Sequence, residues 1–365
     1  MPTLFDPIRI GDWELPNRIL MAPLTRQRAT SDRVPTPLMV EYYTQRASAG
    51  MIISEATAVS PMGVGYACTP GIWSEEQVEG WRKITEAVHQ AGGRMLLQLW
   101  HVGRISHPMY LNGAIPVAPS AIQPAGHVSL VRPLTPYVTP RALELSEIPG
   151  IIEEYRHGAE NAKRAGFDGV EIHGANGYLL DQFLQDKTNH RTDAYGGSVE
   201  NRARLTIEVV EAAISVWGPE RVGLHVAPRG VFNDISDSDP LAIFGHVAVE
   251  MKKRKIAFMC ARESLGERRI GPELKKLFGG IFIANEQFTK ETGSQVLAAG
   301  EADAVGYGVP FIANPDLPER FRLSAPLNPA DPSTFYTSGP KGYVDYPFLE
   351  KSVANKQQPA TIAAG

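Results

Sequence analysis

Short apolar segments rich in β-branched residues alternate along this chain with longer segments in which apolar residues recur at helical spacing. The short segments predict strands at 18–24, 51–55, 94–100, 169–173, 222–227, 256–260, 280–284 and 304–306. The longer segments predict helices at 36–48, 74–90, 147–165, 198–217, 240–253, 271–278, 289–299 and 315–322. Repeated strand–helix units are typical of a parallel sheet with right-handed crossovers. Eight such units predict an α/β protein with a (β/α)8 TIM-barrel fold.

An open doubly wound sheet is the competing architecture. That fold favours a Gly-rich G-x-G-x-x-G turn after its first strand, and no such turn follows residues 18–24. The closed barrel is therefore preferred.

Two segments fall outside the alternation. Residues 4–15 alternate around Gly11 and Asp12, which predicts an N-terminal hairpin that plugs the barrel floor. Residues 101–146 are rich in proline and follow the third strand, which predicts a capping insertion above the barrel mouth. We expect a single domain over 1–350 and a flexible tail over 351–365.

Composition and charge narrow the possible functions. Lys and Arg total 36 and Asp and Glu total 40, so the net charge of −4 argues against a nucleic-acid partner. No apolar run reaches the roughly 20 residues that span a membrane, and the N-terminus has no signal-peptide pattern. The 2 cysteines, Cys68 and Cys260, predict reduced thiols and a cytoplasmic location.

The most informative polar residues follow the fourth predicted strand. Barrel enzymes carry their chemistry at the carboxyl ends of strands, and His173, Asn176 and Tyr178 lie there. His173 and Asn176 can direct two hydrogen-bond donors at one carbonyl or nitro oxygen. The ordinary pKa of a phenol is about 10, so Tyr178 can act as a general acid at neutral pH. A histidine satisfied by its surroundings and a tyrosine packed beneath the loop are the alternative interpretation.

Two other classes of function stay open at this point. One is a zinc-dependent TIM-barrel hydrolase that uses His101 and His173 with Glu55 and Glu263, although none of the histidines has the H-x-H or H-E-x-x-H spacing of zinc sites. The other is a ligand-binding barrel without turnover. The loops at 284–286 and 307–309 are placed to hold the phosphate of a cofactor, as the loops after strands seven and eight do in many barrels. We predict no metal site.

Long strings of this chain resemble the old yellow enzyme family of FMN-dependent ene- and nitro-reductases. They include NRILMAPLTR at 17–26, EYYTQRASAGMIISEAT at 41–57, LQLWHVGRISH at 97–107, GFDGVEIHGANGYLLDQFL at 166–184, YGGSVENRARL at 195–205 and FIANPDLPERF at 311–321. PMGVGY at 61–66 and GHVSLVRPL at 126–134 look most similar to the bacterial xenobiotic reductase B branch. The resemblance extends from about residue 4 to residue 349.

This resemblance implies roles for particular residues. It assigns His173 and Asn176 to the oxygen of the substrate's electron-withdrawing group, and Tyr178 to protonation of the neighbouring carbon. The expected FMN contacts are Pro23, Leu24, Thr25, Ala56, Gln98, His225, Asn285, Gly308 and Val309. The expected substrate-binding residues are Tyr66, Trp100, His173, Asn176 and Tyr336.

Two positions depart from the family pattern. His225 stands where many members have an arginine facing the flavin, and Val309 stands where many have a cation that pairs with the phosphate. Phosphate binding here must therefore depend on backbone N–H groups or on another cation.

The resemblance implies an oxidoreductase with tightly bound FMN that takes electrons from NADPH or NADH. The expected substrates are small electrophiles, namely activated alkenes such as enones and maleimides, nitro compounds and nitrate esters, reduced by ping-pong hydride transfer. We expect a monomer or a homodimer.

Overall fold

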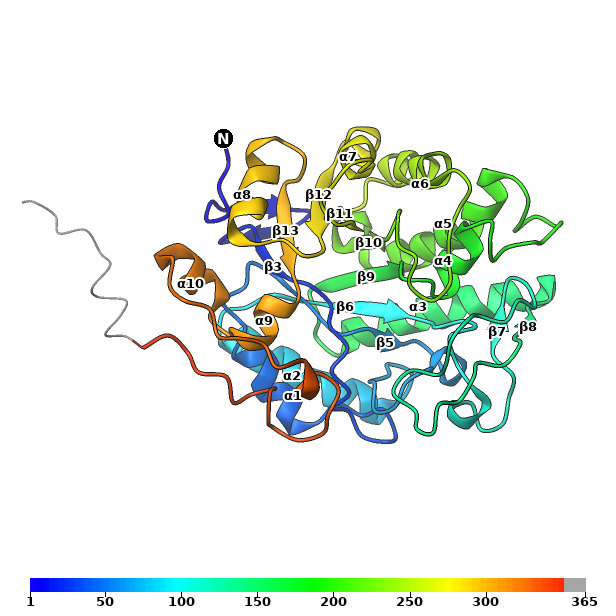
Figure 1. The fold of residues 1–365 in the computed structure, drawn as a ribbon, viewed down its shortest axis with the longest axis horizontal. Coiled ribbons are helices and arrows are strands. Elements are labelled where there is room, and N and C mark those ends of the chain that lie inside the picture. Colours follow the sequence, from blue (N-terminus) through cyan, green and yellow to red (C-terminus); the bar gives the residue numbers. More distant parts are fainter. Residues whose placement is uncertain (351–365) are drawn as a thin grey trace, which may run out of the picture.

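The computed structural model describes residues 1–350, and its centre is a closed parallel barrel of eight strands (Figure 1). Each strand pairs with the next in chain order, and the last pairs with the first, so the sheet has no free edge. The barrel strands are β3 (Ile19–Met21), β4 (Ile52–Ile53), β6 (Met95–Trp100), β9 (Gly169–Gly174), β10 (Val222–Val226), β11 (Phe258–Arg262), β12 (Ile281–Asn285) and β13 (Ala304–Tyr307). The short strand β5 (Thr57–Ala58) extends the pairing beside β6. The predicted barrel is confirmed.

Helices surround these strands and bury one apolar face against them (Figure 1). They are α1 (Pro37–Thr44), α2 (Glu75–Gln90), α3 (Ile148–Arg164), α4 (Leu179–Leu184), α5 (Val199–Trp217), α6 (Pro240–Arg254), α7 (Gly271–Phe278), α8 (Lys290–Ala298), α9 (Val309–Ala313) and α10 (Leu317–Leu323). The N-terminal end of α2 has a capping box. The Ser74 hydroxyl accepts from the backbone N–H of Gln77, and the side-chain oxygen of Gln77 accepts from the backbone N–H of Ser74.

Several predicted boundaries differ from the structure. The first strand was predicted to reach residue 24 but ends at Met21, because residues 22–24 leave the sheet and turn into the barrel mouth. The helices α4 and α9 were not predicted. Both are shorter than two turns, and α4 begins where the Asp181 carboxylate accepts from the backbone N–H of Gly177 at 2.9 Å.

The N-terminal hairpin consists of β1 (Ile8–Ile10) and β2 (Trp13–Leu15). Its apolar side chains join the barrel-floor residues in one buried cluster that includes Phe258. Gly11 turns the hairpin at φ +52°, and a Cβ there would lie 1.9 Å from the carbonyl oxygen of Glu220. The predicted floor plug is thus present, and only glycine fits at its turn.

The insertion after β6 lies beyond the carboxyl end of that strand and contains the short paired strands β7 (Val117–Ala118) and β8 (Arg141–Ala142) (Figure 1). The buried Arg104 ties it to the barrel by donating to the backbone carbonyls of Ile122 at 3.0 Å and Asp234 at 2.8 Å. The insertion therefore has a fixed place above the mouth.

None of the helices within residues 1–350 combines the length and apolar character needed to cross a membrane. The predicted flexible tail, 351–365, lies outside the described residues, and the single-domain organisation of 1–350 stays a prediction.

Candidate active site

A cavity of about 660 Å³ opens at the carboxyl ends of the barrel strands. This volume lies within the usual range for cofactor and ligand sites, roughly 300–1,000 Å³. The structure brings every predicted site residue to its wall: Pro23, Leu24, Thr25, Ala56, Tyr66, Gln98, Trp100, His173, Asn176, Tyr178, His225, Asn285, Gly308, Val309 and Tyr336. Residues more than 300 positions apart in sequence thus share one surface.

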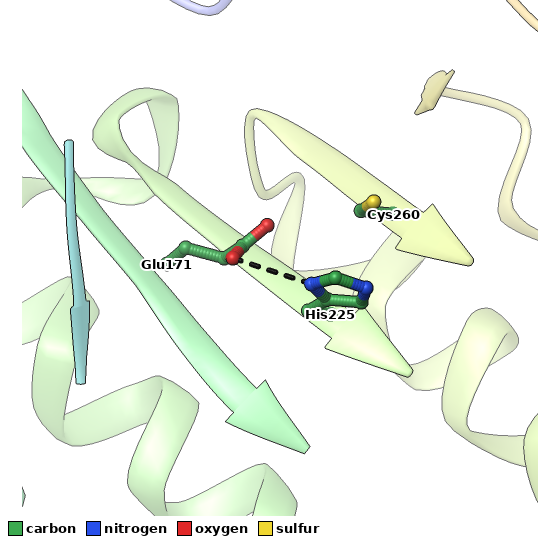
Figure 2. Close-up of side chains that lie close together, drawn as sticks. All are labelled: Glu171, His225 and Cys260. Atoms are coloured by element: carbon green, nitrogen blue, oxygen red, sulfur yellow. Dashed lines mark ion pairs between the residues drawn. The ribbon is translucent and has the colours of Figure 1, made fainter. Parts of the chain in front are cut away.

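His225 reaches this wall from β10 and is paired below it with Glu171 of β9 (Figure 2). The His225 Nδ1 lies 3.4 Å from Oε2 of Glu171, and the same carboxylate oxygen accepts a 2.7 Å hydrogen bond from Nε2 of Gln98. Cys260 lies opposite His225 on the neighbouring strand β11. All four side chains are buried.

The pair favours a charged His225. Burial lowers the pKa of His225, but Cys260 and Glu171 outweigh it and raise the pKa to about 10. Burial also raises the pKa of the Cys260 thiol. The raised pKa favours a positively charged His225 at the cavity wall, at the position where the resemblance places an arginine in many members.

His173 is kept neutral. Burial lowers its pKa well below the ordinary value, and the charges of His225 and Arg262 lower it further. Its ring stacks at 19° against Trp100, with centroids 6.3 Å apart. A neutral imidazole has one N–H donor, which is what a hydrogen bond to a substrate oxygen requires.

Tyr178 stands edge-on to both His173 and Trp100. Its hydroxyl lies 2.9 Å from the hydroxyl of Tyr66, which the sequence identified only as a wall residue. Burial raises the pKa of Tyr178 to about 12, although its hydrogen bond to Tyr66 acts in the opposite direction. Tyr178 therefore holds its proton at neutral pH and can donate it.

The residues of the zinc hypothesis do not come together. The Glu55 carboxylate contacts the Tyr43 hydroxyl at 3.2 Å, and the Glu263 carboxylate is held by Arg229 at 2.6 Å. Nδ1 of His101 accepts from the backbone N–H of Gly103 at 3.0 Å. Within residues 1–350, the one group close enough to share a metal ion is Glu171 with His225 and Cys260, and it contains none of these residues.

The cavity fits a planar, heteroatom-rich group such as a flavin. Three of the residues that line it each have a buried ring nitrogen with no partner among the described residues: Nδ1 of His173, Nε2 of His225 and Nε1 of Trp100. Unpartnered buried polar atoms are costly, so partners from a bound molecule are expected. At the other end, a Cβ at Gly308 would lie 3.2 Å from Cδ2 of Leu24, and Val309 is 48% exposed. Among the described residues, Arg262 is the one lysine or arginine that lines the cavity.

The sequence analysis missed several lining residues that other segments supply. Ser129 and Leu130 come from the insertion, Phe232 from the loop after β10, and Phe335 from the C-terminal segment. Arg262 is the last residue of β11, and nothing in the sequence assigned it a partner. No local pattern marks such residues, because loops bring them in from elsewhere in the fold.

A family model described as "NADH:flavin oxidoreductase / NADH oxidase family" matches residues 3–328. This chain belongs to that family. The resemblance to the old yellow enzyme family is therefore confirmed, whereas the xenobiotic reductase B branch stays a prediction.

Relatives and solved structures agree with this assignment. The chain is 45% identical to 12-oxophytodienoate reductase 1 of Oryza sativa subsp. japonica over 366 residues, covering 95% of this chain and 93% of the relative. It is similar to the old yellow enzyme homologue NCR from Zymomonas mobilis, with 48% identity, a TM-score of 0.93, and coverage of 95% and 100%. It is also similar to morphinone reductase in complex with tetrahydroNAD, with 49% identity, a TM-score of 0.92, and coverage of 96% and 99%.

The chain is thus an oxidoreductase of the old yellow enzyme family, with FMN as its cofactor and a nicotinamide nucleotide as its reductant. Family membership also removes the barrel without turnover and leaves the zinc hydrolase without support.

Proposed function

We propose that this protein is an NAD(P)H-dependent reductase of activated alkenes, including enones and maleimides, and of nitro compounds and nitrate esters. Reductant and electrophile would use the same cavity in turn, in a ping-pong sequence. The observation that carries the proposal is the convergence of His173, Asn176 and Tyr178 on a cavity that fits a flavin. Relatives named as reductases of 12-oxophytodienoate and morphinone support the alkene part of it.

The chemistry that bound FMN supplies is hydride transfer between the nicotinamide and the substrate. The protein's own contribution begins with His173 and Asn176, which donate hydrogen bonds to the oxygen of the electron-withdrawing group. These bonds strengthen as negative charge develops on that oxygen, so they lower the barrier. Trp100 and Tyr66 exclude water from one side of the site. Tyr178 delivers a proton to the α-carbon, next to the electron-withdrawing group.

The cation at His225 fits the same scheme. A positive charge beside the cofactor favours the form of it that carries more negative charge. Pro23, Thr25, Ala56 and Gln98 would bind the ring system. Asn285, Gly308 and Val309 would bind the phosphate end through amide groups.

Anaerobic addition of NADPH, and separately of NADH, to the purified protein tests the proposal. We expect a yellow protein that bleaches, and that regains its colour when 2-cyclohexenone is added. A colourless protein with stoichiometric zinc would support the hydrolase instead. A yellow protein that bleaches but is not reoxidised by any enone, nitro compound or nitrate ester would contradict the proposed substrates.

Nitro substrates should depend less on Tyr178 than alkenes do. Hydride can add to an electron-poor ring or nitrogen without a proton at carbon, whereas alkene reduction requires one. Tyr178→Phe should therefore slow the reduction of cyclohexenone more than that of a nitroaromatic. Parallel loss of both activities would contradict this distinction.

We also propose a cytoplasmic location, because 2 cysteines are too few for a disulfide framework. The proposed assembly is a monomer or a homodimer.

A further inference from the structure

Asn176 is held in an unusual way at the rim of the cavity. Its backbone lies in the left-handed region at φ +60°, and its backbone carbonyl accepts a 2.8 Å hydrogen bond from the side chain of Asn233. Its side-chain oxygen Oδ1 accepts a 2.7 Å hydrogen bond from Arg262, which reaches it from the end of β11 across the intervening strand β10. Backbone and side chain are thus fixed separately.

Arg262 is itself clamped. Its Nε lies 2.7 Å from Oε2 of Glu286, and its second terminal nitrogen donates to Oε1 of the same carboxylate at 3.1 Å. This two-point contact is the geometry in which a guanidinium is most firmly oriented. The end of β11 and the loops after β9 and β12 are connected in this way on one side of the cavity, and all three residues line it.

The chemistry of arginine decides which end of the Asn176 amide faces the cavity. A guanidinium has five N–H donors and no acceptor, so only the oxygen end of an amide can face it. The NH2 end of Asn176 makes no hydrogen bond with any residue of 1–350 and is left to donate into the cavity. A positive charge at the oxygen end also polarises the amide and makes its N–H a stronger donor.

We propose that Arg262, held by Glu286, is a positioning residue that orients and polarises Asn176 for substrate binding. This inference rests on the proposed function, in which Asn176 donates to the substrate oxygen. Arg262 acts through Asn176 and needs no contact with the substrate.

The decisive experiment is a double-mutant cycle with Arg262→Met and Asn176→Ala. The rate of anaerobic reoxidation by 2-cyclohexenone should fall about tenfold in Arg262→Met, the value of one hydrogen bond to a charged group. In the Asn176→Ala background, Arg262→Met should have almost no further effect, because the group it orients is gone. Affinity for cyclohexanone, which binds without being reduced and is titrated by flavin absorbance, should follow the same pattern.

Two conservative variants separate orientation from packing. Lysine is also only a donor, so Arg262→Lys should retain part of the rate. Glutamine can accept as well as donate, so Arg262→Gln lets the Asn176 amide turn over and should be as impaired as Arg262→Met. If lysine and glutamine behave alike, Arg262 does not act by orienting the amide.

The chain offers a matched control at its surface. Arg164 is bonded to Glu75 and donates to Oδ1 of Asn161 at 3.0 Å, the same three residue types far from the cavity. Arg164→Met should leave both readouts unchanged.

The outcomes distinguish the two levels of the argument. If Asn176→Ala alone leaves cyclohexenone reduction unchanged, the proposed function of Asn176 fails. Suppose that Asn176→Ala slows the reaction. If Arg262→Met has no effect on the wild-type rate, or if the rate losses of the two single variants multiply in the double variant, the inference about Arg262 fails while the proposed function stands. Loss of FMN affinity in Arg262→Met, with an unchanged rate in the loaded fraction, would assign Arg262 to the cofactor and also overturn the inference.

Discussion

Replacement of Tyr178 by phenylalanine removes one hydroxyl from the site and leaves the rest of the side chain in place. The ring can keep its edge-on packing, 5.0 Å from Trp100 and 5.2 Å from His173 between centroids, so we expect the cavity to retain its shape. The pKa of Tyr178 is about 12, so at pH 7 the phenol is protonated in all but about one molecule in 10⁵. The variant therefore removes a proton donor that is fully loaded under working conditions.

We expect the oxidative half-reaction with 2-cyclohexenone to slow by about 10²- to 10⁴-fold, the usual contribution of a general acid. Reduction of the flavin by NADPH needs no proton at carbon, so it should remain close to the wild-type rate. Anaerobic stopped-flow absorbance measures the two half-reactions separately. Because the pKa of Tyr178 lies far above neutrality, the wild-type oxidative rate should show no loss from its ionisation between pH 6 and 9.

Tyr66→Phe is the matched control. It breaks the same 2.9 Å hydrogen bond between the two hydroxyls but keeps the proton on Tyr178. Each variant removes one hydroxyl and leaves the other one buried without its hydrogen-bond partner, which costs about 1–3 kcal/mol of stability in either case. Tyr66→Phe should therefore match Tyr178→Phe in stability and exceed it in oxidative rate. Equal rates in the two variants, or equal losses in both half-reactions of Tyr178→Phe, would refute the proton-donor role.

Three further predictions follow from the site and the fold. His173→Ala should slow reoxidation by enones roughly 100- to 1,000-fold with FMN retained, as loss of one oxyanion donor does, and a wild-type rate in stopped flow would refute the role. Glu171→Gln should lower the pKa of His225 from about 10, because the carboxylate that favours the imidazolium is gone while burial still opposes the charge. The stabilisation from this raised pKa is fully present below the unfolded value of about 6.5 and is lost as the pH rises toward 10. The difference in unfolding free energy between wild type and variant should therefore shrink between these two pH values. NMR titration of His225 measures the pKa directly, and an unchanged pKa would contradict the pairing with Glu171. Gly11→Ala should lower the Tm by a few degrees without changing kcat. A side chain at φ +52° would collide with the Glu220 carbonyl, which costs about 1–3 kcal/mol. An unchanged Tm in thermal unfolding would show that the floor plug does not need this turn.

The sequence by itself determined the barrel and the composition of its mouth. Buried parallel strands are covered on both faces, so segments such as β3 (ILM) and β12 (IFIAN) are visible as apolar runs between helical segments. Once the strands are parallel and closed, their carboxyl ends must meet. For this reason His173, Asn176 and Tyr178 could be assigned to the barrel mouth before any distance was known, whereas Gln98 and His225 were assigned to the same site by the resemblance to the family.

Only the tertiary structure decided which of these side chains act on one another. Glu171 supports the charge on His225 because neighbouring strands of the barrel place both side chains on its inside, and neither residue has a sequence signal for the other. Tyr66 meets Tyr178 across 112 residues, and Arg262 crosses a strand to reach Asn176. Such contacts depend on strand register, side-chain length and loop path, and these are set by the packing of the whole chain and not by any local pattern of residues.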